Sequence, residues 1–148
     1  MSAVTNDSFE LTVNKTIAAP PEQVFDAWLD IDMLSRWFGP SDEMSCEIKQ
    51  LEPREGGKYH IEMISPDGES YNLHGEYLRI DRPRELVMTF YWISEPEQVM
   101  LTSVRFEASG DTTEIHLHHE KMPSAESRDA HHQGWCGTLD RLERLFAG

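Results

Sequence analysis

The sequence predicts an α+β fold in which a curved antiparallel sheet of seven strands wraps around one long C-terminal helix. Three observations lead to this fold class. The chain opens with a period-two alternation of apolar and polar residues, six further strand-like runs follow at short intervals, and an amphipathic stripe closes the chain. Short connections favour an antiparallel meander, and a sheet with one apolar face can bury it by curling around such a helix. This is the helix-grip arrangement.

The first strand is expected over residues 9–17, where apolar side chains from Phe9 to Ile17 alternate with polar ones. Pro20 and Pro21 then introduce a first short helix, because the first amide groups of a helix lack partners and prolines cost little there. This helix is expected to run through Asp30. A second short helix is expected to end before Gly39-Pro40. Two short helices therefore lie between the first and second strands.

Six strands separated by turn-forming Gly, Pro, Asp and Ser are expected next. They cover 44–51, 58–64, 71–80, 85–92, 98–107 and 113–120. Ser124 is a favourable N-cap for the last helix. The apolar stripe of that helix recurs at steps of four, three and four residues, at Trp135, Leu139, Leu142 and Phe146.

Composition excludes several classes of partner. The 148 residues show no repeat or linker, so one domain over 1–148 is expected. The 13 basic and 27 acidic residues give a net charge of −14, which disfavours nucleic acids and anionic membranes as partners. Two cysteines make no disulfide framework, the N-terminus does not resemble a signal peptide, and no apolar run is long enough to span a membrane. A soluble cytoplasmic protein, monomeric or homodimeric, is expected.

Short motifs over nearly the whole chain resemble those of one superfamily. They are APPEQVFDAW at 19–28, RWFGP at 36–40, GGKY at 56–59, PDG at 66–68, RPRELVMTF at 82–90 and HHQGWCGTLDRL at 131–142. Together they are similar to the SRPBCC (START-like, Bet v allergen-like) superfamily, in the branch named for the activator of the heat-shock-protein-90 ATPase homologue. The resemblance implies the helix-grip fold and a cavity between sheet and last helix. It does not imply one activity, because relatives include carriers, cyclases and co-chaperone domains.

Strand parity and apolar character predict which side chains face this cavity. Gly75 lies in a strand interior, where a glycine marks a close approach or room for a ligand. The expected cavity residues are Trp37, Phe38, Tyr59, Ile61, Met63, Gly75, Tyr77, Phe90, Trp92, Val104, Leu117, His119, His131 and Trp135. Aromatic and Met side chains of this kind suit a flat or hydrophobic ligand, and they also fill ordinary cores.

Histidine is the conspicuous residue type. His116 and His118 are expected on the convex face of the sheet, where Glu120 is the one further candidate ligand, so no metal or other cofactor is expected. His119 and His131 are expected to face the cavity. The alternative for each of them is a neutral imidazole hydrogen-bonded within the core.

Three functions are compatible with these features, and a binding module is preferred over an enzyme. It would hold a small hydrophobic or aromatic molecule, neutral or cationic, because an acidic surface slows the approach of anions. The second is an enzyme of the polyketide cyclase, lyase or hydrolase type that uses His119, Tyr77 and His131 for proton transfer. The third is a co-chaperone-like stimulator of a heat-shock ATPase in the stress response, with a protein partner. It rests on the family resemblance.

Overall fold

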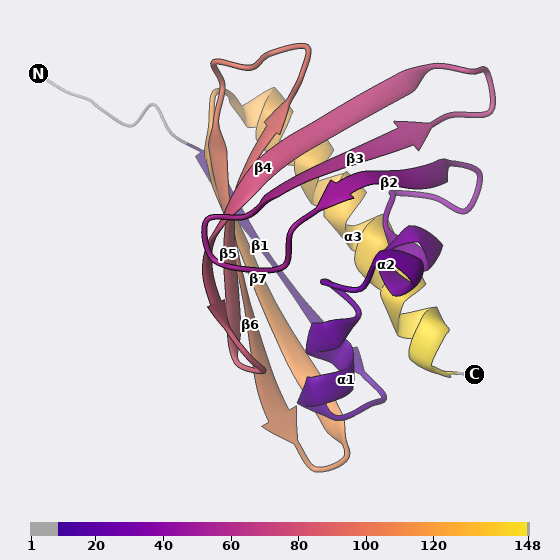
Figure 1. The fold of residues 1–148 in the computed structure, drawn as a ribbon, viewed down its shortest axis with the longest axis vertical. Coiled ribbons are helices and arrows are strands. Elements are labelled where there is room, and N and C mark those ends of the chain that lie inside the picture. The colour runs from indigo at the N-terminus through magenta and orange to yellow at the C-terminus, as the bar shows by residue number, and fades with distance from the viewer. Residues whose placement is uncertain (1–8, 148) are drawn as a thin grey trace, which may run out of the picture.

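The computed structural model describes residues 9–147 (Figure 1). The predictions made for residues 1–8 and 148, including the absence of a signal peptide, lie outside the described residues. The elements follow the predicted order: β1 (Phe9–Ile17), α1 (Pro21–Asp26), α2 (Ile31–Trp37), β2 (Ser45–Leu51), β3 (Lys58–Ile64), β4 (Ser70–Asp81), β5 (Glu85–Trp92), β6 (Met100–Ser109), β7 (Thr112–Met122) and α3 (Ala125–Ala147). None of the helices in the described part of the chain is both long and apolar enough to cross a membrane.

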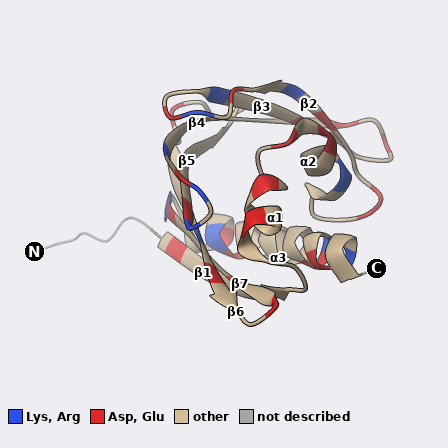
Figure 2. Ribbon diagram, turned by 60° about the horizontal axis from the view of Figure 1, so that its bottom comes forward, with Lys and Arg blue, Asp and Glu red and all other residues tan. Residues whose placement is uncertain are grey.

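All seven strands belong to one antiparallel sheet in the order β1-β7-β6-β5-β4-β3-β2. The strands from β2 to β7 form a meander, and β1 joins it by pairing with β7. Figures 1 and 2 show the sheet curling around α3, with α1 and α2 placed inside one end of the curl. The predicted helix-grip fold is confirmed.

The two faces of the sheet alternate along each strand as the parity of the sequence requires. The inner face carries buried side chains, and the outer face carries partly exposed ones. The buried inner positions on four of the strands are Tyr59, Ile61, Met63, Leu73, Gly75, Tyr77, Thr102, Val104, Phe106, Ile115, Leu117 and His119. Acidic residues are spread over loops, strands and helices at the surface (Figure 2).

The first helix is shorter than expected. α1 ends at Asp26, and the chain turns through Leu29, whose amide donates to the Asp26 carbonyl at 3.1 Å. The reason is Asp30, which adopts an extended backbone and accepts the Met33 amide at 3.0 Å as the N-cap of α2. A residue that caps the next helix cannot continue the previous one.

The sixth strand also begins later than expected, at Met100 rather than residue 98. Gln98 is held in a turn, because its amide donates to the Glu95 carbonyl at 3.0 Å. The side-chain amide of Gln98 donates to the Lys121 carbonyl at 3.3 Å. β7 runs two residues beyond the expected end, to Met122, which pairs with Phe9 of β1.

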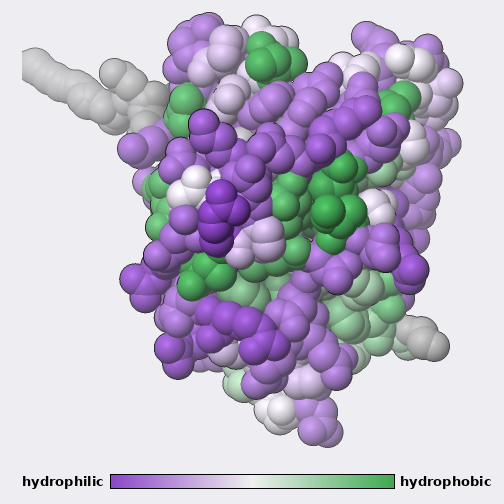
Figure 3. Space-filling model, in the orientation of Figure 1, coloured by the Kyte–Doolittle hydropathy of each residue, from purple (hydrophilic) through white to green (hydrophobic). Residues whose placement is uncertain are grey.

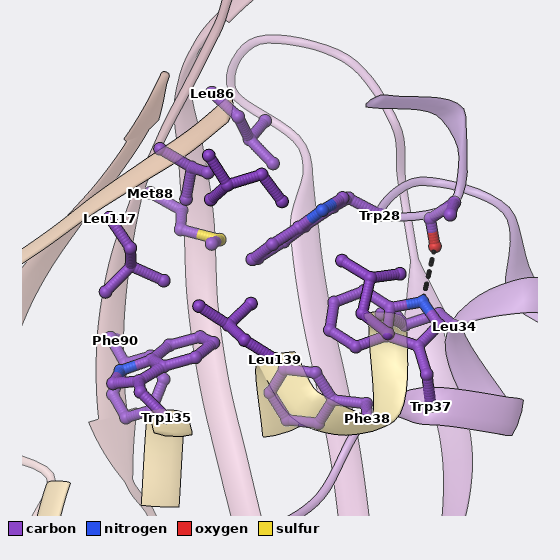
Figure 4. Packing of buried hydrophobic residues seen from close by; sticks show 14 of the residues in the cluster. Trp28, Leu34, Trp37, Phe38, Leu86, Met88, Phe90, Leu117, Trp135 and Leu139 are labelled. Atoms are coloured by element: carbon purple, nitrogen blue, oxygen red, sulfur yellow. Dashed lines mark hydrogen bonds between the residues drawn. The ribbon is translucent and has the colours of Figure 1, made fainter. Parts of the chain in front are cut away.

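The long helix begins as expected, since the Ser124 hydroxyl accepts the Ser127 amide at 3.0 Å. Its apolar stripe buries Trp135, Leu139 and Leu142 against the sheet and the short helices. Figure 4 shows this core from close by: Trp28 points between the sheet residues Leu86 and Met88 and the α2 residues Leu34 and Trp37. Each fully buried large side chain contributes roughly 1.5–3 kcal/mol to folding, so α3 is held mainly by apolar packing.

Candidate ligand-binding site

A cavity of about 430 Å³ lies between the first half of α3, one end of the β3–β4–β5 sheet and the loop that joins α2 to β2. This volume is within the range of small-molecule sites. The lining residues are Phe38, Pro40, Met44, Met63, Ser65, Tyr71, Phe90, Trp92, Ala130, His131, Gly134, Trp135 and Thr138. Tyr71 is 43% exposed and marks the mouth. On the face that Figure 3 shows, hydrophobic residues gather in a band across the middle, and most of the surrounding surface is hydrophilic.

Six of the expected cavity residues line this space: Phe38, Met63, Phe90, Trp92, His131 and Trp135. Three others, Tyr59, Ile61 and Tyr77, lie deeper, around a separate void of about 20 Å³. Phe38, Phe90 and Trp135 line both spaces and therefore separate them. Trp37, Gly75, Val104, Leu117 and His119 line neither. The interior of the curl is thus largely packed, and the open space is at one end of it.

Trp37 lies away from the cavity because it joins α2 to the end of α1. Its indole N–H donates to the Ala27 carbonyl at 3.1 Å, the dashed line in Figure 4. Its ring packs edge to face on Trp28, with centroids 4.8 Å apart. Trp37 is completely buried in these contacts and has no surface left for a ligand.

Gly75 marks a close approach, and what approaches is Tyr59 of the neighbouring strand. A Cβ at Gly75 would lie 2.4 Å from the Tyr59 ring and 2.1 Å from the Thr89 carbonyl oxygen. The ring crosses β4 above Gly75, and its hydroxyl donates to the Thr89 carbonyl at 2.5 Å. Tyr59 therefore ties β3 to β5 across the glycine, and neither residue faces the cavity.

The cavity also includes lining residues that the sequence analysis did not select: Pro40, Met44, Ser65, Tyr71, Ala130, Gly134 and Thr138. Two signals could have found some of them. Tyr71 has the same parity as Leu73 on β4, and the α3 residues from Ala130 to Thr138 recur on one helical face with His131 and Trp135. Pro40 and Ser65 lie in loops, where neither periodicity applies.

The loop that carries Phe38 and Pro40 is fixed on α3 by one arginine and one glycine. Arg141 donates to the Phe38 carbonyl at 3.0 Å and to the Arg36 carbonyl at 3.1 Å. A Cβ at Gly137 would lie 2.2 Å from the Pro40 carbonyl oxygen, so the loop backbone rests directly on the helix. These contacts position the wall of the cavity opposite the sheet.

His131 is held between Trp92 and the first turn of α3. Its Nδ1 lies 2.8 Å from the Ser127 carbonyl oxygen, which can only accept, so Nδ1 carries the proton. Its Nε2 accepts the Trp92 indole N–H at 3.0 Å. Burial lowers the pKa of His131, which favours this neutral form.

His119 also accepts a tryptophan indole N–H, but it lies deeper in the core than His131. It is completely buried, and its Nδ1 accepts the Trp135 indole N–H at 2.9 Å. Its Nε2 lies 3.3 Å from the Met100 sulfur. Burial, followed by the nearby His131 and His118, lowers the pKa of His119 to about 3. The ring is neutral at physiological pH.

These contacts decide what the histidines can do chemically. In both rings the nitrogen that could accept a proton already accepts an indole N–H. Burial also raises the pKa of the Tyr77 hydroxyl well above its ordinary value. The site therefore offers aromatic surface to a guest, and its imidazoles act as hydrogen-bond acceptors that orient Trp92 and Trp135.

The convex-face histidines make pairwise contacts with side chains of neighbouring strands. His116 lies 3.0 Å from the Asn14 side-chain oxygen, and His118 lies 2.8 Å from a carboxylate oxygen of Glu10. Among residues 9–147, no three His, Cys, Asp or Glu side chains are grouped as metal ligands. Cys46 and Cys136 are free thiols, and burial raises the pKa of Cys46 to about 11.

The curled sheet, the helix inside it and the apolar cavity between them define a helix-grip domain, a fold that in general serves ligand binding. The chain belongs to the family described as Activator of Hsp90 ATPase homolog 1-like protein, whose model matches residues 18–147.

Solved structures share this fold. Protein CV1439 from Chromobacterium violaceum is 23% identical, with a TM-score of 0.87 over 94% of this chain and 97% of that one. The AHSA1 protein from Silicibacter pomeroyi is 21% identical, with a TM-score of 0.83 over 94% and 98%. Protein Ms6760 from Mycobacterium smegmatis is 20% identical, with a TM-score of 0.80 over 94% and 91%. A comparison with curated proteins gave no match. At these sequence identities, the similarity between this chain and the three solved structures shows a shared fold only.

Proposed function

We propose that this protein binds a small, predominantly hydrophobic molecule in the cavity between α3 and the sheet. The observation that carries the proposal is the composition of the wall. Five aromatic rings and two thioethers surround about 430 Å³: Phe38, Tyr71, Phe90, Trp92, Trp135, Met44 and Met63. Apolar surface removed from water contributes about 25 cal/mol per Å², so a guest of matching shape gains most of its affinity from desolvation.

The polar atoms of the inner wall support the same proposal. The Thr138 hydroxyl donates to the Gly134 carbonyl at 2.8 Å, and the Trp92 indole N–H donates to His131 Nε2. A guest therefore meets few unsatisfied donors or acceptors there and needs few polar groups of its own. The two imidazoles have no free acceptor nitrogen for proton transfer, which favours binding over catalysis. The cytoplasm is the compartment we propose, since both cysteines are free thiols.

The neutral fluorescent probe N-phenyl-1-naphthylamine, titrated into the protein and its Gly134 variants, tests the proposal. Gly134 lies in the middle of the cavity-facing stripe of α3, and a Cβ there would have no atom within 4 Å. Gly134→Phe directs a ring from this open position into the cavity. We expect the protein to bind the probe and Gly134→Phe to weaken that binding by about tenfold or more, since the cavity is filled.

Gly134→Ala is the matched control, because one methyl group leaves most of the volume open, and it should bind the probe almost as the parent does. Equal binding by Gly134→Phe, or no binding by the parent, would contradict the proposal. If no apolar compound binds while the protein stimulates a heat-shock ATPase, the co-chaperone interpretation takes its place.

A further inference from the structure

We propose that the preferred guest is an organic cation: an amine or quaternary ammonium group attached to a hydrophobic body. The inference rests on the proposed function and adds the charge of the guest to it. Aromatic rings line the cavity, carboxylates lie close to its lining residues in the β3–β4 turn and after β5, and none of the described lining residues is Lys or Arg.

The aromatic rings are arranged around the space rather than stacked on one another. Phe90 lies at the centre, with ring centroids 5.6 Å from Trp92 and 5.9 Å from Trp135. Phe38 meets Trp135 edge to face at 6.0 Å, and Tyr71 stands at the mouth. A cation within about 6 Å of such ring faces is attracted by their quadrupoles, most strongly where water is excluded.

One side of the mouth is formed by the β3–β4 turn, which carries Asp67 and Glu69. The Tyr71 hydroxyl lies 3.5 Å from a Glu69 carboxylate oxygen, and the Ser65 hydroxyl donates to Asp67. Both Tyr71 and Ser65 line the cavity. The charge of Glu69, followed by burial and the charge of Asp67, raises the pKa of the Tyr71 hydroxyl. Negative potential therefore reaches the cavity wall.

Glu95 supplies further negative charge, just beyond the end of β5. Its amide donates to the Trp92 carbonyl at 2.9 Å, so this carboxylate follows directly after the cavity strand β5. Burial lowers the pKa of His131, and both the Ser127 carbonyl and the charge of Glu95 oppose that decrease. The charge of Glu95 therefore acts on His131, which lines the cavity from α3.

Positive charge does not balance these carboxylates. Among the described residues that line the cavity, none is Lys or Arg. Arg141 reaches the back of the α2–β2 loop, where it is occupied by the Phe38 and Gly39 carbonyls and by Asp42 at 3.2 Å. The chain as a whole carries a net charge of −14, which attracts cations and repels anions at low salt.

Three naphthalenes that differ in one group test the inference: 1-naphthylmethylamine, which is protonated at pH 7, the neutral 1-naphthylmethanol and the anion of 1-naphthylacetic acid. We expect the amine to bind about tenfold more tightly than the alcohol, and the carboxylate to bind least, in calorimetric titrations at low salt. The advantage of the amine should shrink in high salt and in a Glu69→Gln/Glu95→Gln double variant.

The control is Glu22→Gln on α1, at the other end of the fold in Figure 1, which should leave the order of affinities unchanged. Equal affinity of amine and alcohol, or tighter binding of the carboxylate, would overturn the charge preference while leaving the proposed function standing. Failure of all three naphthalenes to bind would contradict the proposed function as well.

Discussion

Gly75→Ala is expected to lower the free energy of unfolding by about 3 kcal/mol or more. The added methyl would lie 2.1 Å from the Thr89 carbonyl oxygen and 2.4 Å from the Tyr59 ring. Both are fixed: the carbonyl belongs to the paired strand β5, and the ring is buried and donates to that same carbonyl. The strands must separate or Tyr59 must leave its place. Urea denaturation of parent and variant measures the loss.

Two further variants separate this cause from a general effect of replacing glycine. Gly134→Ala adds the same methyl where no atom lies within 4 Å, and it should stabilise α3 by about 1 kcal/mol. In a Tyr59→Leu background, Gly75→Ala should cost less than in the parent, because one of the two obstacles has been removed. A loss of under 1 kcal/mol for Gly75→Ala in the parent would contradict this account of the β3–β5 tie.

Lowering the pH from 6.5 to 4.5 should cost the parent about 2 kcal/mol more than it costs a His119→Gln variant. The pKa of His119 is about 3 in the folded protein and about 6.5 in the unfolded chain. Between those values the unfolded state binds one more proton, so stability falls as the pH falls, by about 1.4 kcal/mol per unit. Above the unfolded pKa the two proteins should show the same pH dependence.

Glutamine is the informative replacement because its carbonyl can still accept the Trp135 indole N–H while it never titrates. Every other titratable group is present in both proteins, so the difference between them reports His119 together with its coupling to the nearby His131. His132→Gln, at an exposed position on α3, is the control and should follow the parent curve. Parallel curves for parent and His119→Gln between pH 6.5 and 4.5 would contradict a neutral, buried His119.

The fold could be predicted from the sequence because its signals are local. Period-two alternation on β1 and β3 and the stripe from Trp135 to Leu142 each report which face is buried, and a sheet that curls around the helix buries both apolar faces. The boundary at Asp26 could not be predicted, because Trp28 and Leu29 continue the helical spacing while Asp30 is taken by the cap of α2. Competing local signals of this kind are resolved only by the tertiary structure.

The site was harder to predict because inward-facing residues form both core and cavity. Tyr77 and Leu117 share the inner face with Met63 and Phe90, yet only the latter two reach the open space. The two pairs differ in their position along the inside of the curved sheet. Which positions stay open depends on how far α3 and the α2–β2 loop fill that inside space. The alternation along a strand predicts which face of the sheet a side chain lies on. It does not predict how far along that face the side chain lies from the open end.

Indole N–H signals of the four tryptophans, followed by NMR during titration with 1-naphthylmethanol, test the central claim most directly. Trp92 and Trp135 line the cavity, Trp28 lines only the small inner void, and Trp37 lines neither. If a hydrophobic guest occupies the cavity, the signals of Trp92 and Trp135 should shift together to saturation while that of Trp37 stays in place. Shifts that leave Trp92 and Trp135 unmoved, or that move Trp37 as much as these two, would contradict binding at this site.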